Sequence, residues 1–434
     1  MEPSRGTPSR VRRLIVALLF VSVVINYVDR SSIAIAGPAI ADELKLTPVQ
    51  IGLVFSAFAW AYSPLQIPGS LLVDRIGPRL LYPVAIAAWS LFALLQGFAS
   101  SLASLFLLRL GVGASEVPSY PMNNRIITTW LPERERATAV GIYVSGQYVG
   151  LGFLVPVIVW LQSALGWRGM FIVTGSLGLL WAVGFRLLYR DPQGSRANAA
   201  ELALIEQGGG KVRWARAAAG SDPAEVPAAR AFRDRRMIGL LLAHMGETSA
   251  NWFFLTWFPT YLVRYRHIEF LKAGFLASLP FLSAWFGVLL SGVVSDLLLR
   301  RGVKLSLARK IPIVTGALLA VTIIGANYVS DPGLIIGFMT LAFFGSGLAA
   351  ISWSVVSSVA PPNLVGLASG AFNFVGTSMG IVVPIVIGFL VHGDDFSPAL
   401  LFVGGMACLS VLSWTVIIGR IERIGSLPAR PTSG

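Results

Sequence analysis

Charged residues interrupt two of the apolar stretches in this chain, where a charge is costly. The sequence INYVDRSSIAIAGP at 25–38 carries Asp29 and Arg30, and a later apolar stretch carries Arg109 and Glu116. An ionised side chain at the centre of a bilayer costs at least ~2.5–3.5 kcal/mol, so it normally faces a cavity and has a partner. These residue types suggest anion binding and proton transfer, because an arginine binds a carboxylate through two hydrogen bonds and a buried carboxyl can take up a proton.

Helical spacing predicts which of these side chains share a face. Arg109 and Glu116 are seven residues apart, which is close to two helical turns, so they point into the same space. Asp29 and Arg30 are neighbours about 100° apart and cannot both reach the same group. We expect Arg30 to face a cavity together with Arg109, with Asp29 as a titratable group beside it.

Two interpretations of the arginines follow. In the first, Arg30 and Arg109 bind the carboxylate of a substrate. In the second, Asp29 or Glu116 neutralises each arginine, and no substrate is involved. Neutral hydrogen-bonding residues in the same chain favour the first interpretation, because a fixed ion pair does not require them.

A third polar pair, His244 and Glu247, lies within the seventh apolar stretch. A lone histidine in an apolar segment is more often a packing or interfacial residue than a functional one. Glu247, one turn later, either adds a third proton site or alters specificity. Both residues are candidate extra titratable groups.

The elements that position these residues must be membrane helices. Of the 434 residues, 55% are hydrophobic and only 13% are charged, about half the charged share of a typical soluble domain. The net charge of +13 does not indicate a nucleic-acid partner here, because the basic residues lie between apolar runs. The runs reach the roughly 20 residues that a helix needs to cross a bilayer. They predict spans at about 14–38, 49–72, 80–98, 102–126, 137–162, 169–189, 237–262, 273–295, 311–327, 333–358, 365–391 and 398–420.

The distribution of positive charge predicts the orientation. Most of the 34 basic residues fall in segments that share one side of the membrane if both termini are cytoplasmic. We therefore expect a multi-pass protein of the inner (plasma) membrane with both termini in the cytoplasm. The longest hydrophilic stretch, 191–236, reads as a cytoplasmic linker in which SRANAAELALIEQGGG suggests a short surface helix. It separates an N-terminal half at 1–190 from a C-terminal half at 237–434.

A repeated loop relates the two halves. GSLLVDRIGPR at 69–79 and SGVVSDLLLRRG at 291–302 each join the second and third spans of a half. The first copy resembles the loop signature of the major facilitator superfamily, with Ser70 where glycine is usual. This resemblance implies gating roles for four residues: Asp74, Arg75, Arg79 and Asp296. The second copy departs from the signature at Leu297, where an arginine is usual, which leaves its gating ion pair in doubt.

The resemblance predicts the fold class. It implies an all-α membrane protein with twelve transmembrane helices in two six-helix halves around a central cavity, and transport by alternating access. The signature identifies a superfamily and does not name a substrate.

A second resemblance is narrower and covers essentially the whole chain. The stretch LRLGVGASEVPSYPMNNRIITTWLPERERATAVGIYVSGQYVG at 108–150, together with NYVDR at 26–30 and FFLTWFPTYL at 253–262, resembles the anion:cation symporter family and its bacterial sugar-acid branch. The resemblance implies that Asp29 and Glu116 are the proton-coupling pair. It also implies a set of substrate-binding residues: Tyr27, Arg30, Arg109, Gln147 and Asn373. Trp353 is a further candidate as a hydrogen-bond donor to substrate hydroxyls.

The function expected is a proton-coupled symporter that imports an organic anion, most simply a hexonate or hexarate. The alternative is a facilitator or exchanger for another carboxylate, such as tartrate, an aromatic acid or a dicarboxylate. No nucleotide-binding loop, metal cluster or nucleophile triad is present in the sequence, so we expect neither an enzyme nor a cofactor besides the coupling protons. The expected partners are a small carboxylate, protons and the lipid bilayer, with the protein as a monomer.

Overall fold

The computed structural model describes residues 7–210 and 227–424, apart from the side chains of Ile67, Asp74 and Pro362. In these ranges the chain is helical, and the one β-type pairing is an isolated bridge between His392 and Asp395. The predicted all-α class is confirmed. By their contacts, the described residues divide into two units, one of 7–210 with 255–278 and one of 227–254 with 279–424.

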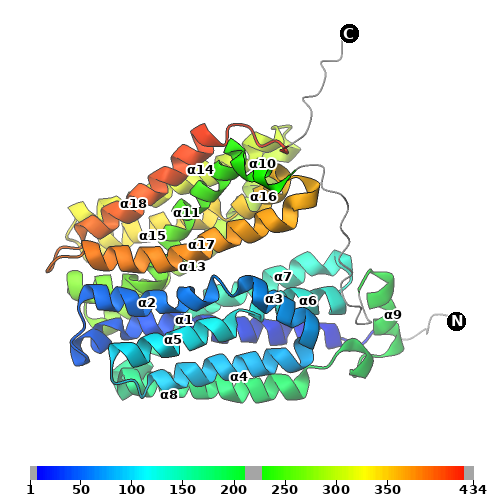
Figure 1. The fold of residues 1–434 in the computed structure, drawn as a ribbon, viewed down its shortest axis with the longest axis horizontal. Coiled ribbons are helices and arrows are strands. Elements are labelled where there is room, and N and C mark those ends of the chain that lie inside the picture. The colour runs from blue at the N-terminus through cyan, green and yellow to red at the C-terminus, as the bar shows by residue number, and fades with distance from the viewer. Residues whose placement is uncertain (1–6, 211–226, 425–434) are drawn as a thin grey trace, which may run out of the picture. The chain divides into compact units, whose positions relative to one another are not determined.

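The first unit contains α1 to α9 and the segment after α11. Its elements are α1 (Val11–Glu43), α2 (Pro48–Tyr62), α3 (Gln66–Ile76), α4 (Pro78–Gln96), α5 (Leu102–Glu116), α6 (Ser119–Trp130), α7 (Glu133–Tyr148), the π-helical η1 (Val149–Phe153), α8 (Val155–Leu188), the 3-10 turn η2 (Pro192–Gly194), α9 (Ala199–Gln207), α12 (Phe258–Thr260) and η3 (Tyr261–Tyr265). Helices α1, α4, α5 and α8 lie side by side along their lengths (Figure 1).

The second unit contains the later helices. Its elements are α10 (Ala228–Arg233), most of α11 (Arg235–Thr256), most of α13 (Phe270–Arg300), α14 (Leu305–Val321), η4 (Thr322–Tyr328), α15 (Pro332–Ala349), α16 (Ser352–Val359), η5 (Pro362–Leu364), α17 (Val365–Leu390), α18 (Ser397–Leu412) and η6 (Ser413–Ile417). Part of its core is a cluster around the buried side chains of Phe372 and Trp414.

The helices cover all twelve predicted spans, although not always as single helices. In the described chain, eight helical segments are long and apolar enough to cross a membrane: 11–43, 78–96, 155–188, 270–300, 305–328, 332–359, 365–390 and 397–417. Each of the four remaining predicted spans is interrupted near a proline, namely Pro64, Pro118, Pro156 and Pro259. Proline lacks the N–H that continues a helix, so these spans are broken helices.

Two glycines make turns that other residues would strain. Gly77 has a φ of 87° and joins α3 to α4 within the loop that resembles a transporter signature. Gly166 has a φ of 68° and interrupts α8, so the 34-residue helix bends between the predicted fifth and sixth spans. Both values lie in the left-handed region, where a side chain is disfavoured.

Helices α2 and α5 approach each other closely enough to require a glycine. A Cβ at Gly113 would collide with the backbone of Phe58, at its carbonyl oxygen. The close approach places Arg109, one turn before Gly113 on α5, near the Phe58 ring of α2. Packing between these two helices therefore helps to position a residue that the sequence analysis singled out.

The segment 255–278 belongs to the first unit because its side chains contact α1 and α2. The rings of Trp257 and Phe55 meet edge to face with centroids 5.5 Å apart. Arg264 forms an ion pair with Asp42 and donates a hydrogen bond to the Pro38 carbonyl oxygen at 3.0 Å. This segment follows α11 in sequence but packs on the end of α1.

A buried carboxylate on α9 caps the first residues of α1. Glu201 is fully buried and accepts hydrogen bonds from the backbone N–H groups of Val11 and Arg12, both at 3.1 Å, and from the Ser9 hydroxyl. It also forms an ion pair with the Arg12 side chain at 3.1 Å. The first N–H groups of a helix have no partner within the helix, and the helix dipole favours an anion at that end. Glu201, from a distant part of the chain, therefore provides acceptors for the first N–H groups of α1.

We expect Glu201→Ala to lower the free energy of unfolding by about 2 kcal/mol, because buried donors at the start of α1 lose their acceptor. The measurement is the thermal midpoint of the purified protein in detergent. Glu206→Ala is the matched control, since Glu206 lies exposed on the same helix and should cost less than about 0.5 kcal/mol. Equal midpoints for the two variants would show that the cap does not stabilise α1.

Candidate functional site

An ion pair between α1 and α5 forms the centre of the candidate site. Arg30 places Nε 2.8 Å and Nη2 2.7 Å from the same carboxylate oxygen, Oε2 of Glu116. Glu116 is fully buried, and the Arg30 side chain is 12% exposed. The other oxygen of Glu116, Oε1, has no hydrogen-bond partner in the described part of the protein, although the Asn26 amide lies close by.

Aromatic rings surround the Arg30 guanidinium. Its Cζ lies 4.5 Å from the centroid of Phe58, 5.0 Å from that of Tyr62 and 5.2 Å from that of Tyr27. Ring faces attract a cation and exclude water around it. The second arginine, Arg109, shares the Phe58 ring, with its Cζ 5.6 Å from the centroid.

Arg109 and Asp29 are buried beside this ion pair, and neither forms a hydrogen bond or an ion pair within the described part of the chain. Arg109 is 3% exposed, and its Nε and Nη1 find no acceptor among the described residues. Asp29 is 2% exposed, and no donor in the described chain meets hydrogen-bond geometry at either of its oxygens, although the Trp89 indole lies nearby. Asp29, Arg109 and Glu116 are near enough to interact electrostatically.

Neutral hydrogen-bonding groups line the same region. The hydroxyl oxygens of Tyr27 and Tyr120 lie 3.3 Å apart. Gln147 is partly buried on α7, and α7 continues into η1, where Gly150 packs against the backbone of α1 at Tyr27. The structure thus brings five of the predicted residues together within the first unit: Tyr27, Asp29, Arg30, Arg109 and Glu116.

Sequence reasoning missed several members of this cluster. Phe58, Tyr62, Trp89 and Tyr120 look like ordinary core or membrane residues. Only the packing of α2, α4 and α6 brings them to the buried charged groups, with Trp89 beside Asp29. Asn26 could have been found from the sequence, because it precedes Arg30 by four residues and so lies on the same face of the helix.

In the second unit, Glu247 of the predicted titratable pair is held by hydrogen bonds, and His244 lies beside it. Glu247 accepts a hydrogen bond from the Ser352 hydroxyl through Oε2 and another from the Trp414 indole through Oε1, each at 2.8 Å. His244 Nδ1 lies 3.5 Å from Glu247 Oε2. The His244 ring stacks on Phe372 with centroids 3.6 Å apart. Both carboxylate oxygens of Glu247 therefore have donors, in contrast to those of Asp29.

The two other predicted substrate residues also lie in the second unit. Trp353 meets the His244 ring edge to face, with centroids 5.6 Å apart, and is 46% exposed. Asn373 follows Phe372 on α17 and is partly buried. Their substrate-binding roles remain predictions.

The residues of the predicted gate lie near the ends of α3, α4 and α13. Arg75, Arg79 and Asp296 are exposed, and the side chain of Asp74 lies outside the described residues. Their gating roles also remain predictions.

The chain has close relatives along nearly its full length. It is 46% identical over 427 residues to the D-galactonate transporter of Escherichia coli O6:H1, covering 96% of this chain and 98% of the relative. It is 41% identical over 435 residues to the probable galactarate/D-glucarate transporter GarP of Escherichia coli K12, covering 98% of each chain. The predicted resemblance is confirmed, and these relatives are transporters rather than enzymes.

Solved structures show the same fold. The D-xylose-proton symporter superposes with a TM-score of 0.72 at 12% identity, covering 94% of this chain and 98% of that one. A bacterial homologue of the human lysosomal transporter Spinster, in an inward-facing and occupied conformation, superposes with a TM-score of 0.69 at 19% identity, covering 95% of both chains. Residues 19–384 match the Major Facilitator Superfamily. The chain therefore belongs to the Major Facilitator Superfamily, as a membrane transporter with its helical fold.

Proposed function

We propose that this transporter is a proton-coupled symporter that imports a sugar acid, a hexonate or hexarate, by alternating access. The observation that carries the proposal is Arg109, a buried arginine with two nitrogens that lack acceptors among the described residues. A cation in this state is costly unless an anion joins it. The names of the relatives, which refer to galactonate, galactarate and glucarate, support a sugar acid as that anion.

The surroundings of Arg109 suit a polyhydroxy carboxylate. A guanidinium binds a carboxylate through two parallel hydrogen bonds. The hydroxyls of Tyr27 and Tyr120 and the amide of Gln147 offer neutral donors and acceptors for sugar hydroxyls. The substrate-binding roles of Trp353 and Asn373 stay predictions from the sequence.

The ion pair between Arg30 and Glu116 supports a coupling of proton binding to substrate binding. While Glu116 is ionised, it occupies Arg30 through two contacts. A proton on Glu116 removes this competition, so Arg30 becomes available to the substrate carboxylate. Asp29, buried without hydrogen-bond donors among the described residues, is proposed as the second proton carrier. The substrate anion and the protons then stabilise each other's binding.

Two protons also make import electrically favourable. A monoanion entering a cell that is negative inside is opposed by about 2.3 kcal/mol per 100 mV. The same anion with two protons carries one net positive charge and is driven inward by that amount. The proposed location is the inner membrane, with both termini in the cytoplasm, no cofactor beyond the coupling protons, and the protein acting as a monomer.

The experiment that tests the proposal is uptake by the intact protein in proteoliposomes with a panel of labelled acids. The panel contains galactonate, glucarate, galactarate, tartrate and an aromatic acid, each measured with and without a pH gradient. We expect gradient-dependent accumulation of a sugar acid. Uptake that only equilibrates the substrate, or that needs a counter-substrate, would favour the facilitator or exchanger.

The structure also gives an expectation for Glu247. Because both of its oxygens accept hydrogen bonds, we expect Glu247→Gln to leave the number of protons carried per substrate unchanged and to lower the thermal midpoint. The NH2 group of the glutamine would face the Ser352 hydroxyl or the Trp414 indole N–H, which now donate to a carboxylate oxygen. The measurement is the proton-to-substrate ratio from reversal potentials, with Glu206→Gln as control. A ratio lowered by one would identify the His244 and Glu247 pair as a third proton site.

A further inference from the structure

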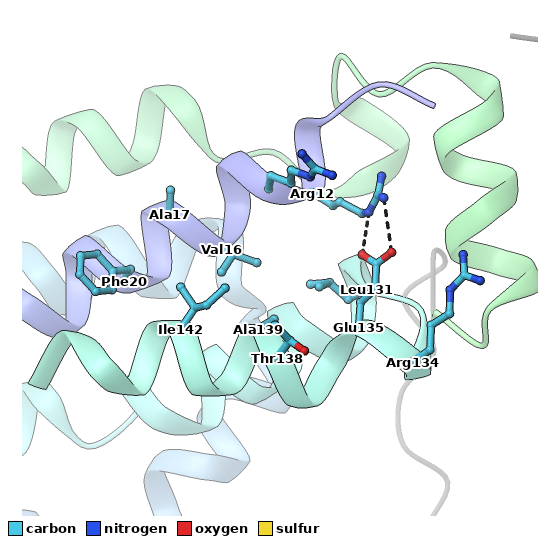
Figure 2. A pocket seen from close by; sticks show the side chains of 11 residues that line it. Arg12, Val16, Ala17, Phe20, Leu131, Arg134, Glu135, Thr138, Ala139 and Ile142 are labelled. Atoms are coloured by element: carbon cyan, nitrogen blue, oxygen red, sulfur yellow. Dashed lines mark hydrogen bonds and ion pairs between the residues drawn. The ribbon is translucent and has the colours of Figure 1, made fainter. Parts of the chain in front are cut away.

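A pocket of about 560 Å³ lies between the first halves of α1 and α7, within the first unit (Figure 2). Arginines form part of its lining, namely Arg12, Arg13 and Arg134. Six apolar side chains form most of the remainder: Val16, Ala17, Phe20, Leu131, Ala139 and Ile142. Glu135 and Thr138 complete it. None of these residues belongs to the candidate transport site.

The lining changes from charged to apolar along the helices. On α1 it runs from Arg12 to Phe20, and on α7 from Arg134 to Ile142, eight residues or roughly 12 Å of helix in each case. Figure 2 shows Arg12 and Arg134 at one end of the pocket and Phe20 and Ile142 toward the other. The pocket is therefore amphipathic along its length, with its charged end where α1 begins.

The charged end has an excess of positive charge. Arg12 is neutralised by Glu135 at 2.8 Å and by Glu201 at 3.1 Å. Arg13 and Arg134 are exposed, and no acidic side chain among the described residues pairs with them. Two guanidinium groups therefore remain available to an anion at this end of the pocket.

We propose that this pocket binds an anionic phospholipid, with its phosphate at Arg13 and Arg134 and part of an acyl chain along Phe20 and Ile142. A basic pocket between membrane helices attracts anionic headgroups, and the apolar wall suits a hydrocarbon chain. The same wall offers few partners for the hydroxyls of a sugar acid. The proposal is independent of the proposed transport function, since it uses different residues.

Native mass spectrometry of the purified full chain tests the proposal, with phosphatidylglycerol as the anionic lipid and phosphatidylethanolamine as the zwitterionic control. We expect tighter binding of phosphatidylglycerol, and about 30-fold weaker binding in the double variant Arg13→Gln/Arg134→Gln, because each arginine near an anionic headgroup contributes about 1 kcal/mol. The matched control is Arg300→Gln/Arg301→Gln, which removes two exposed arginines elsewhere and should leave binding unchanged.

Two further arms separate a lipid from a soluble anion. Ala17→Phe fills the apolar part and leaves the arginines in place, so it should weaken phosphatidylglycerol binding. Glycerol 3-phosphate and galactonate, added in excess, should not displace the lipid. The proposal would be overturned if either soluble anion displaced the lipid or if Ala17→Phe bound phosphatidylglycerol as the intact chain does. It would also be overturned if the two arginine double variants lost phosphatidylglycerol binding equally.

Discussion

Glu116→Gln is expected to abolish voltage-driven accumulation of substrate while leaving substrate exchange in place. The substitution removes one of the two proposed proton carriers, so the transported charge falls from one to zero. A membrane potential of 100 mV acting on one charge is worth about 2.3 kcal/mol, or about 50-fold in accumulation. In the intact protein, Glu116 contacts both Nε and Nη2 of Arg30. Exchange should persist because a neutral glutamine at this position no longer competes with the substrate for Arg30.

The measurement is accumulation of labelled galactonate in proteoliposomes under an imposed potassium diffusion potential, with counterflow as the assay of exchange. Glu206→Gln controls for the loss of an acidic residue, because Glu206 is exposed on α9. If Glu116→Gln accumulates substrate like the intact chain, Glu116 does not carry a coupling proton. If counterflow is lost as well, Glu116 is needed for more than proton transfer.

Arg109→Lys is expected to weaken substrate binding by about 10- to 100-fold with little effect on folding. Lysine keeps the positive charge but cannot present two parallel N–H groups to a carboxylate, and a charge-assisted hydrogen bond contributes about 1.5–3 kcal/mol. Stability should change little, because two of the guanidinium nitrogens have no acceptor among the described residues.

Two measurements are needed. Isothermal titration calorimetry with galactonate gives the affinity, and the thermal midpoint in detergent gives the stability. Arg301→Lys is the control, an exposed arginine on the loop after α13 that should bind substrate normally. A lowered midpoint with unaltered affinity would support the structural interpretation, in which Arg109 only neutralises neighbouring acids.

Much of the fold could be predicted from the sequence because it depends on local patterns. Apolar runs of sufficient length predict helices, and each of the twelve predicted spans is helical in the structure. The breaks near Pro118 and Pro156 could have been predicted from the missing N–H. They were not, because the apolar pattern continues across them.

The candidate site was only partly predictable. The sequence by itself determined that Arg30, Arg109, Asp29 and Glu116 lie on membrane helices and that Arg109 and Glu116 share one face, because helical spacing depends on the chain alone. Only the tertiary structure decided that Arg30 pairs with Glu116 and that Asp29 is left without a donor among the described residues.

Those pairings depend on which helices approach each other and how closely, as where Gly113 lets α5 meet α2. The cap on α1 has the same origin, since Glu201 is about 190 residues away from the N–H groups it accepts. Sequence periodicity fixes the direction of a side chain relative to its own helix. The partner of that side chain depends on how distant segments pack together. The periodicity of a single helix carries no information about that packing.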